Sequence, residues 1–172
     1  MNTAALIIDV QVGLVSGAYN ETQLLENINR VITAVRAKGG HVVFIQHCHA
    51  SYQPLMKDNA SWALHPALDA RGDDTYIEKT ASDSFYQTEL AEVLDAMNVA
   101  ELYITGLQTE YCVDATCRAA QGRGYSVNLV EDAHTTGDSQ LPAATIIAHH
   151  NAVLANLAHP DHPIRLVSSS AV

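Results

Sequence analysis

The sequence predicts an α/β protein with a three-layer, Rossmann-like, doubly wound fold around a mostly parallel, six-stranded sheet. Apolar runs of strand length alternate with amphipathic helical stretches along the chain, and this alternation is typical of βαβ units. The chain has 172 residues, of which 48% are hydrophobic, so it can bury one sizeable core. We therefore expect residues 1–172 to form a single domain.

The first predicted strand covers Ala4 to Ile8, a near-continuous apolar run that ends at Asp9. Such a run is typical of a parallel strand that is buried on both faces. Asn20 and Gln23 predict a capping pair at the start of the helix that follows, and its apolar residues recur at helical spacing up to Gly39. This segment therefore supplies one strand and its crossover helix.

The second predicted strand covers residues 42–46, and a long irregular stretch follows it up to residue 72. Connections of this length in compact domains are often functional. Its larger apolar side chains, Tyr52, Trp62 and Leu64, are therefore candidates for a pocket wall or a subunit contact.

A third strand over residues 75–78 leads into Lys79, and Ser84 with Gln87 predicts the start of another helix. The remaining elements repeat the same unit. They are strands over 101–105, 125–130 and 164–168, a helix from near Cys112 to Gly122 or Gly124, and a helix over 142–157.

Composition and charge exclude several classes of function. The formal charge of -10 gives no basic patch that could attract a nucleic acid. The apolar runs are too short to cross a bilayer, and no cationic segment precedes the first of them, so we expect no membrane association. Three cysteines, an odd number, argue against a secreted disulfide framework. We therefore expect a cytoplasmic protein that acts on a small molecule.

Ligands of open α/β sheets bind beyond the carboxyl ends of the strands, which makes the polar residues at predicted strand ends the candidates for chemistry. They include a carboxylate, an amine and a thiol, the three parts needed for base-assisted nucleophilic attack. The candidates are Asp9, Gln11, His47, His49, Lys79, Cys112, Asp132 and His134.

Cys112 is the predicted nucleophile. A thiol in the first turn of a helix feels the positive end of the helix dipole, and a nearby Lys79 ammonium would lower its pKa further, so we expect a stabilised thiolate. Asp9 could take the thiol proton and later deliver it to a leaving amine. The backbone N–H groups of Gln108 and Cys112 are placed to bind the oxyanion of a tetrahedral intermediate.

Several segments in this order resemble the isochorismatase-like cysteine hydrolases, a family that includes nicotinamidases and N-carbamoylsarcosine amidohydrolases. The resemblance implies a catalytic triad of Asp9, Lys79 and Cys112, a non-proline cis peptide between Leu107 and Gln108, and a homodimer or larger homo-oligomer. The segments that carry it are Ala4–Gln11, Lys79–Phe85 with Thr88 and Leu90, Ile104–Thr116, Gly124-Tyr125 and Val130–Ala133.

The metal pattern of the resembling nicotinamidases is incomplete in this sequence. Those enzymes hold a metal with an aspartate and histidines after the second strand, whereas here His47 stands in the aspartate's place and His49 matches one histidine. We therefore predict no metal and no cofactor, with zinc through His47 and His49 as the less favoured alternative. Without a metal, nicotinamide becomes a less favoured substrate.

These observations predict a hydrolase that cleaves an amide-type C–N bond of a small molecule through a thioester on Cys112. One alternative is an isochorismatase-type vinyl ether hydrolase, in which the cysteine need not attack. Another is a thiol redox or ligand-binding protein without turnover, and a third is a non-catalytic interaction module. The predicted substrate-binding residues are Gln11, His49, Trp62, Tyr111 and His134.

Overall fold

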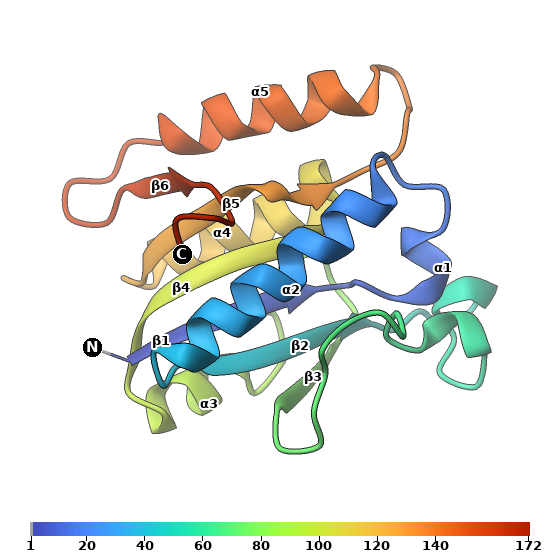
Figure 1. Cartoon of the computed structure of the whole chain (residues 1–172), viewed down its shortest axis with the longest axis horizontal. Coiled ribbons are helices and arrows are strands. Elements are labelled where there is room, and N and C mark those ends of the chain that lie inside the picture. Colours follow the sequence, from blue (N-terminus) through green and yellow to red (C-terminus); the bar gives the residue numbers. More distant parts are fainter. Residues whose placement is uncertain (1) are drawn as a thin grey trace.

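A computed structural model describes residues 2–172 and contains a six-stranded sheet with the order β3-β2-β1-β4-β5-β6 (Figure 1). All neighbouring strands run parallel, which confirms the predicted fold class. The strands are β1 (Asn2–Ile8), β2 (His41–His47), β3 (Thr75–Lys79), β4 (Val99–Leu107), β5 (Ser126–Thr135) and β6 (Ile164–Val167).

Helices cover both faces of the sheet, so it is doubly wound (Figure 1). The long α2 (Glu21–Ala37) packs its apolar stripe on one face, against alternate side chains of β1 and β2. On the other face lie α3 (Leu90–Ala96) and α4 (Asp114–Gly122), while α5 (Ala143–Ala155) contacts β5, β6 and α4. Successive side chains of β1 point to opposite faces of the sheet. Its apolar residues therefore pack alternately into the hydrophobic clusters on the two faces.

The start of α2 differs from the prediction. Asn20 has a left-handed backbone, with φ 52°, and makes no side-chain cap, so the predicted capping pair with Gln23 is wrong. The Gln23 side chain instead donates to Glu26 and Asn27 on the next turn of the helix. The helix therefore begins at Glu21 without that cap, and it ends, as predicted, just before Gly39, which has φ 72°.

The helix predicted from Ser84 starts six residues later, at Leu90. Ser84 is buried, and its hydroxyl lies 2.8 Å from the Thr116 hydroxyl of α4, so a tertiary contact uses the side chain that was expected to cap. Gln87 has a left-handed backbone at φ 52°, which interrupts a helix. The contact of Ser84 with Thr116 and the backbone conformation of Gln87 therefore prevail over the helix start predicted from the local sequence.

Gly106 lets β1 and β4 approach each other at the end of the sheet. Its φ is 113°, and a Cβ atom at this position would overlap the carbonyl oxygen of Ile8. Beside it the β4–β5 register is irregular, since Ile104 pairs with Leu129 whereas Gly106 pairs with His134. This irregularity accounts for the extra length of β5, which runs five residues beyond the predicted end at Val130.

The irregular stretch after β2 contains two short 3-10 turns, Gln53–Leu55 and Ala60–Trp62, and another short helix, α1 (Val12–Val15), packs beside them. This layer lies over the end of β2 (Figure 1). Across residues 2–172, no helix is long and apolar enough to span a membrane.

Candidate active site

The carboxyl ends of β1, β2 and β3 bring three polar side chains together. Asp9 follows β1, and its N–H donates to the Ile45 carbonyl of β2 at 2.8 Å. His47 and Lys79 are opposite each other in the register of β2 and β3. Cys112 reaches the same point from beyond β4, the neighbour of β1 on its other side. Chain connections leave β1 and β4 in opposite directions, so this is the switch point at which such sheets bind ligands.

Lys79 is held as a fixed cation. Its side chain is buried, and its ammonium lies 2.8 Å from Asp9 Oδ2 and donates to the Ala81 carbonyl at 2.9 Å. The Ser82 carbonyl, at 3.5 Å, and His47 Nδ1, at 3.2 Å, complete its surroundings. An ammonium has only three protons to donate, so these contacts saturate it. Lys79 is therefore placed to orient Asp9 and to balance its charge.

Asp9 is fully buried but retains hydrogen-bonding capacity. Among residues 2–172, neither of its carboxylate oxygens has a hydrogen-bond partner with suitable geometry, although the Lys79 ammonium is close enough for an ion pair. Buried carboxylate oxygens are rarely left in this way, because the desolvation cost is large. The free capacity of Asp9 is available to a proton from Cys112 or from a ligand.

Cys112 lies in a π-helical turn, Thr109–Val113, that precedes α4. Its side chain is 8% exposed, and burial together with the Asp9 carboxylate raises the pKa of the thiol to about 12, while Lys79 lowers it less. The prediction of a stabilised thiolate is therefore wrong for the free protein. The resting group is a thiol, which needs a base when it attacks.

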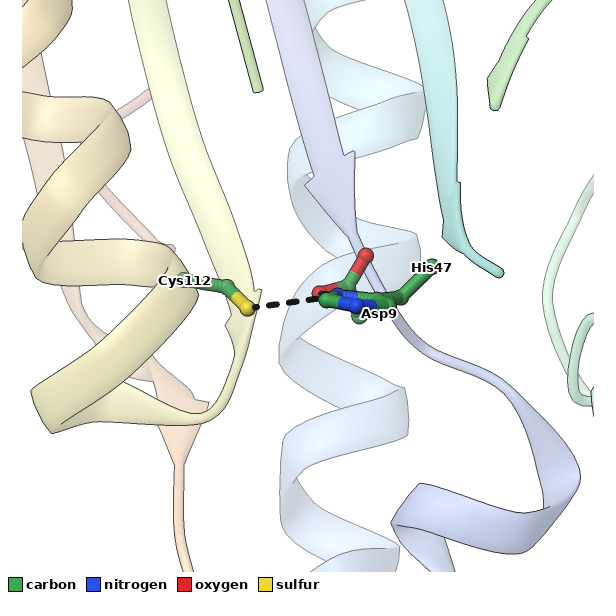
Figure 2. Close-up of side chains that lie close together, drawn as sticks. All are labelled: Asp9, His47 and Cys112. Carbon is green, nitrogen blue, oxygen red and sulfur yellow. Dashed lines mark hydrogen bonds and ion pairs between the residues drawn. The ribbon is translucent and has the colours of Figure 1, made fainter. Parts of the chain in front are cut away.

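His47 is one of the predicted strand-end candidates, for which the sequence suggested no specific role other than that of a metal ligand. Figure 2 shows its ring beside Asp9 and facing the Cys112 sulfur. His47 Nδ1 lies 3.8 Å from Asp9 Oδ2 and 3.9 Å from Cys112 Sγ. Its position at a strand end was the sequence signal for it, whereas its place opposite Lys79 is seen only in the register of β2 and β3.

A cavity of about 190 Å³ opens onto this cluster. Asp9, His47 and Cys112 line it, together with the apolar side chains of Leu14 and Leu55 and with Tyr111. Gln108, the second predicted oxyanion-hole residue, is also part of the lining, and the peptide bond that precedes it is cis. Larger cavities exist elsewhere on the surface, but this one contains the thiol.

Of the predicted substrate-binding residues, Tyr111 lines the cavity, and it is 55% exposed. Gln11 and Trp62 instead bind the backbone of His47, from behind the cavity. His49 lies in the loop after β2, where its Nδ1 accepts from the N–H groups of Ser51 and Tyr52. These three side chains are not part of the cavity lining, and their predicted contacts with a substrate stay predictions.

His134 is also removed from the cavity. It is buried, and its ring bridges Thr109 Oγ1 at 2.9 Å and Asn151 Oδ1 at 2.8 Å. Burial lowers its pKa from 6.5 to about 4. Because Thr109 begins the π-helical turn that holds Cys112, His134 supports this turn from the side away from the cavity.

Among residues 2–172, His49 does not converge with His47 in a group of three or more potential metal ligands, and its Nδ1 accepts from its own loop. The group that does converge is Asp9, His47 and Cys112, whose ligand atoms all lie within 4.8 Å of one another. The Lys79 ammonium contacts two members of that group and supplies the positive charge there. This donor set does not suit a second cation.

Comparison with known proteins identifies the family. The isochorismatase domain family matches residues 3–159. A streptothricin hydrolase from Streptomyces noursei is 34% identical over 84% of this chain and 53% of its own length. The ureidoacrylate amidohydrolase RutB from Yersinia enterocolitica is 28% identical over 78% of this chain and 76% of its own.

A crystal structure described as an isochorismatase family protein has 34% identity and a TM-score of 0.87, covering 97% of this chain and 98% of that one. The chain spans about half the length of the streptothricin hydrolases it matches. The resemblance predicted from the segments around Asp9, Lys79 and Cys112 is thus confirmed. The chain belongs to the isochorismatase family.

Proposed function

We propose that the protein hydrolyses an amide-type C–N bond of a small, uncharged molecule through a thioester on Cys112. One observation carries this proposal: a thiol, a carboxylate with unused hydrogen-bonding capacity and a saturated ammonium meet at one small cavity. A protonated thiol beside a buried carboxylate is suited to attack with simultaneous loss of its proton.

In the first half-reaction, Cys112 Sγ attacks the carbonyl carbon while its proton passes to Asp9. The backbone N–H groups of Gln108 and Cys112 stabilise the oxyanion, a contribution of about a hundredfold or more in turnover for each donor. When the tetrahedral intermediate collapses, the C–N bond breaks and Asp9 gives the proton to the leaving nitrogen. Lys79 stays charged throughout and holds Asp9 in place.

In the second half-reaction, water attacks the thioester carbonyl and Asp9 takes one of its protons. The C–S bond then breaks, and that proton returns to Cys112 as a carboxylic or carbamic acid leaves. Each proton that Asp9 accepts is thus delivered within the same half-reaction. No oxidant, reductant or further cofactor is needed for this cycle.

The size and charge of the cavity support a small neutral substrate. Its volume of about 190 Å³ is below the ~300–1,000 Å³ that is usual for drug-sized ligands. The charged group in the lining is Asp9, whereas the Lys79 ammonium is already saturated. A substrate carboxylate would therefore meet a like charge without a free cation. The name of the streptothricin hydrolase favours hydrolysis, and that of the ureidoacrylate amidohydrolase favours hydrolysis of an amide-type bond.

The test is a screen of small neutral amides, ureas and lactams with the wild type, Cys112→Ala and Cys48→Ala. Cys48 lies outside the cavity lining and serves as the matched thiol control. We expect turnover by the wild type and Cys48→Ala only, together with an acyl adduct on the Cys112 peptide after rapid quenching. Undiminished turnover by Cys112→Ala would overturn the proposal.

A further inference from the structure

The tautomer of the His47 ring follows from its contact with Lys79. The two nitrogens, Lys79 Nζ and His47 Nδ1, lie 3.2 Å apart. An ammonium can only donate, so Nδ1 must be the acceptor of this hydrogen bond. In the neutral ring the proton is then on Nε2. Lys79 therefore fixes His47 as a hydrogen-bond donor through its other nitrogen.

The Nε2 donor of His47 is available to a ligand. The side chain is 16% exposed, and the residue lines the cavity that contains Cys112. Within residues 2–172 the polar contacts of the ring are made by Nδ1, whereas Nε2 makes none and is not enclosed by protein. A molecule in the cavity can therefore accept a hydrogen bond from Nε2 without displacing a protein group.

The position of the ring is fixed through its backbone. The Gln11 side chain accepts from the His47 N–H at 2.8 Å and donates to its carbonyl at 3.2 Å, and the Trp62 indole donates to the same carbonyl at 3.1 Å. Gln11 also donates to the Trp62 carbonyl at 2.8 Å, which closes the network. Side chains from two distant segments thus hold one residue, as expected where a ligand contact must be placed accurately.

We propose that His47 determines specificity by donating a hydrogen bond from Nε2 to a second, uncharged acceptor on the substrate. The inference rests on the proposed function and deepens it. The favoured substrates are small neutral amides, ureas or lactams that carry another carbonyl, ether or unprotonated ring nitrogen beside the scissile group. Because His47 Nδ1 is 3.9 Å from Cys112 Sγ, this acceptor must lie within a few bonds of the attacked carbon.

Two conservative variants separate this role from a structural one. In His47→Asn the amide oxygen can replace Nδ1 as the acceptor for Lys79, but no donor reaches the position of Nε2. In His47→Gln the longer side chain can place its N–H₂ group near the position of Nε2, but it gives up the acceptor beside Lys79. A residue that served only to hold Lys79 would be replaced better by asparagine.

The measurement needs no known substrate. Cys112 is alkylated with iodoacetamide, which carries a carbonyl acceptor, and in parallel with iodoethane, which carries none, and both rates are read by peptide mass spectrometry. Since both reagents react with the same thiolate, their rate ratio is independent of the Cys112 pKa. The corrected ratio is the iodoacetamide rate divided by the iodoethane rate for Cys112, divided by the same quotient for glutathione in the same buffer. This correction removes the intrinsic difference in reactivity between the two reagents.

We expect His47→Asn to lower the corrected ratio by about three- to tenfold, the usual worth of one neutral hydrogen bond. His47→Gln should stay within about twofold of the wild type on the same scale. The opposite order of the two variants, or equal ratios in both, would overturn the proposal. Absence of turnover in the amide screen with an intact ratio pattern would instead count against the proposed function alone.

A measurement without substitution at His47 guards against misfolded variants. Long-range ¹H–¹⁵N NMR of the Cys112→Ala protein reports the His47 tautomer, and acetamide is then added as a probe. We expect the Nε2–H tautomer and a shift of the Nε2 resonance on titration. The Nδ1–H tautomer, or an Nε2 resonance that does not respond, contradicts the proposal.

Discussion

The side-chain amide of Gln11 binds both backbone polar groups of His47, accepting from the N–H at 2.8 Å and donating to the carbonyl at 3.2 Å. Gln11 is fully buried, and it comes two residues after Asp9. One short segment after β1 therefore supplies the carboxylate of the candidate site and also fixes the neighbouring histidine. Gln11, which the sequence predicted to contact the substrate, is not part of the cavity lining and acts on the cavity through His47.

Replacing Gln11 by Met should destabilise the protein and weaken catalysis together. The change leaves the buried N–H of His47 without its partner and removes one donor from its carbonyl. Each buried polar group left unpaired costs about 1–3 kcal/mol. We expect the free energy of unfolding in urea to fall by about 2–4 kcal/mol on this basis. Gln53→Met, at an exposed position of the same loop layer, is the control and should change stability little.

Gly106→Ala should be strongly destabilising. The new Cβ would overlap the Ile8 carbonyl oxygen, and φ at this position is 113°. Because Ile8 precedes Asp9, relief of the overlap must also displace the carboxylate. We expect a loss of about 3 kcal/mol or more in urea unfolding, with turnover reduced in the remaining folded protein.

Gly122→Ala is the matched control for the Gly106 variant. Apart from its chain neighbours and the backbone of its own helix, no part of residues 2–172 lies within 4 Å of a Cβ placed at Gly122, which ends α4. Alanine there should leave stability unchanged or raise it by up to about 1 kcal/mol. Equal behaviour of the two variants would mean that β1 and β4 are not in the close contact described above.

The sequence predicted the location of the site because parallel strands bring their carboxyl ends to one edge. Asp9 could be placed from the end of an apolar run, Lys79 from the end of a short predicted strand, and Cys112 from the helix after another strand. His47 could be placed at a strand end in the same way, but its contact with Lys79 could not be predicted, since it depends on the register of β2 and β3. Strand register is not readable from a single buried, uniformly apolar strand.

Side-chain contacts to the backbone were the other feature of the site that the sequence could not predict. The sequence predicted substrate contacts for Gln11, a polar residue just after a strand end, and for Trp62, the single tryptophan, in a long irregular stretch. Their partners are the peptide groups of His47, which no side-chain pattern records. Ser84 is a related case, because its hydroxyl makes a hydrogen bond with the Thr116 hydroxyl and does not cap a helix.

His134 should make stability depend on pH below neutrality. Burial lowers its pKa from 6.5 to about 4, so between these pH values the unfolded chain binds a proton at His134 and the folded chain does not. The contribution of neutral, buried His134 to the free energy of unfolding is therefore fully present above pH 6.5 and is lost as the pH falls towards about 4. At 1.36 kcal/mol per pKa unit the loss approaches about 3 kcal/mol.

Urea unfolding at pH 7.0, 5.5 and 4.5 checks this dependence. His134→Gln can keep a polar contact to Asn151 but cannot titrate, so we expect it to be less stable at pH 7 and to show a shallower decline. His149→Gln, at an exposed position of α5, is the control and should keep the wild-type slope. A His134→Gln slope equal to that of the wild type would contradict the assignment.

Asp9→Asn should speed the alkylation of Cys112 but slow the turnover of substrate. The Asp9 carboxylate raises the pKa of the thiol, whereas Lys79 lowers it. Removing the carboxylate charge therefore increases the thiolate fraction at any pH below about 12. We expect faster alkylation by iodoacetamide, about tenfold for each unit by which the pKa falls. Turnover should fall by about 10²–10⁴, because the proton acceptor and donor is lost.

Wild-type alkylation should be slower than that of glutathione at pH 8 and should keep rising through pH 10, since the thiol ionises only near pH 12. Lys79→Met should slow it further, because the group that lowers the thiol pKa is gone. A plateau near pH 7 in the wild type would mean a preformed thiolate, and Asp9 would then not be needed to activate the sulfur. Slower alkylation in Asp9→Asn would likewise contradict the electrostatic role of the carboxylate. The negative charge of Asp9 destabilises the Cys112 thiolate, so removal of that charge must make the sulfur more reactive.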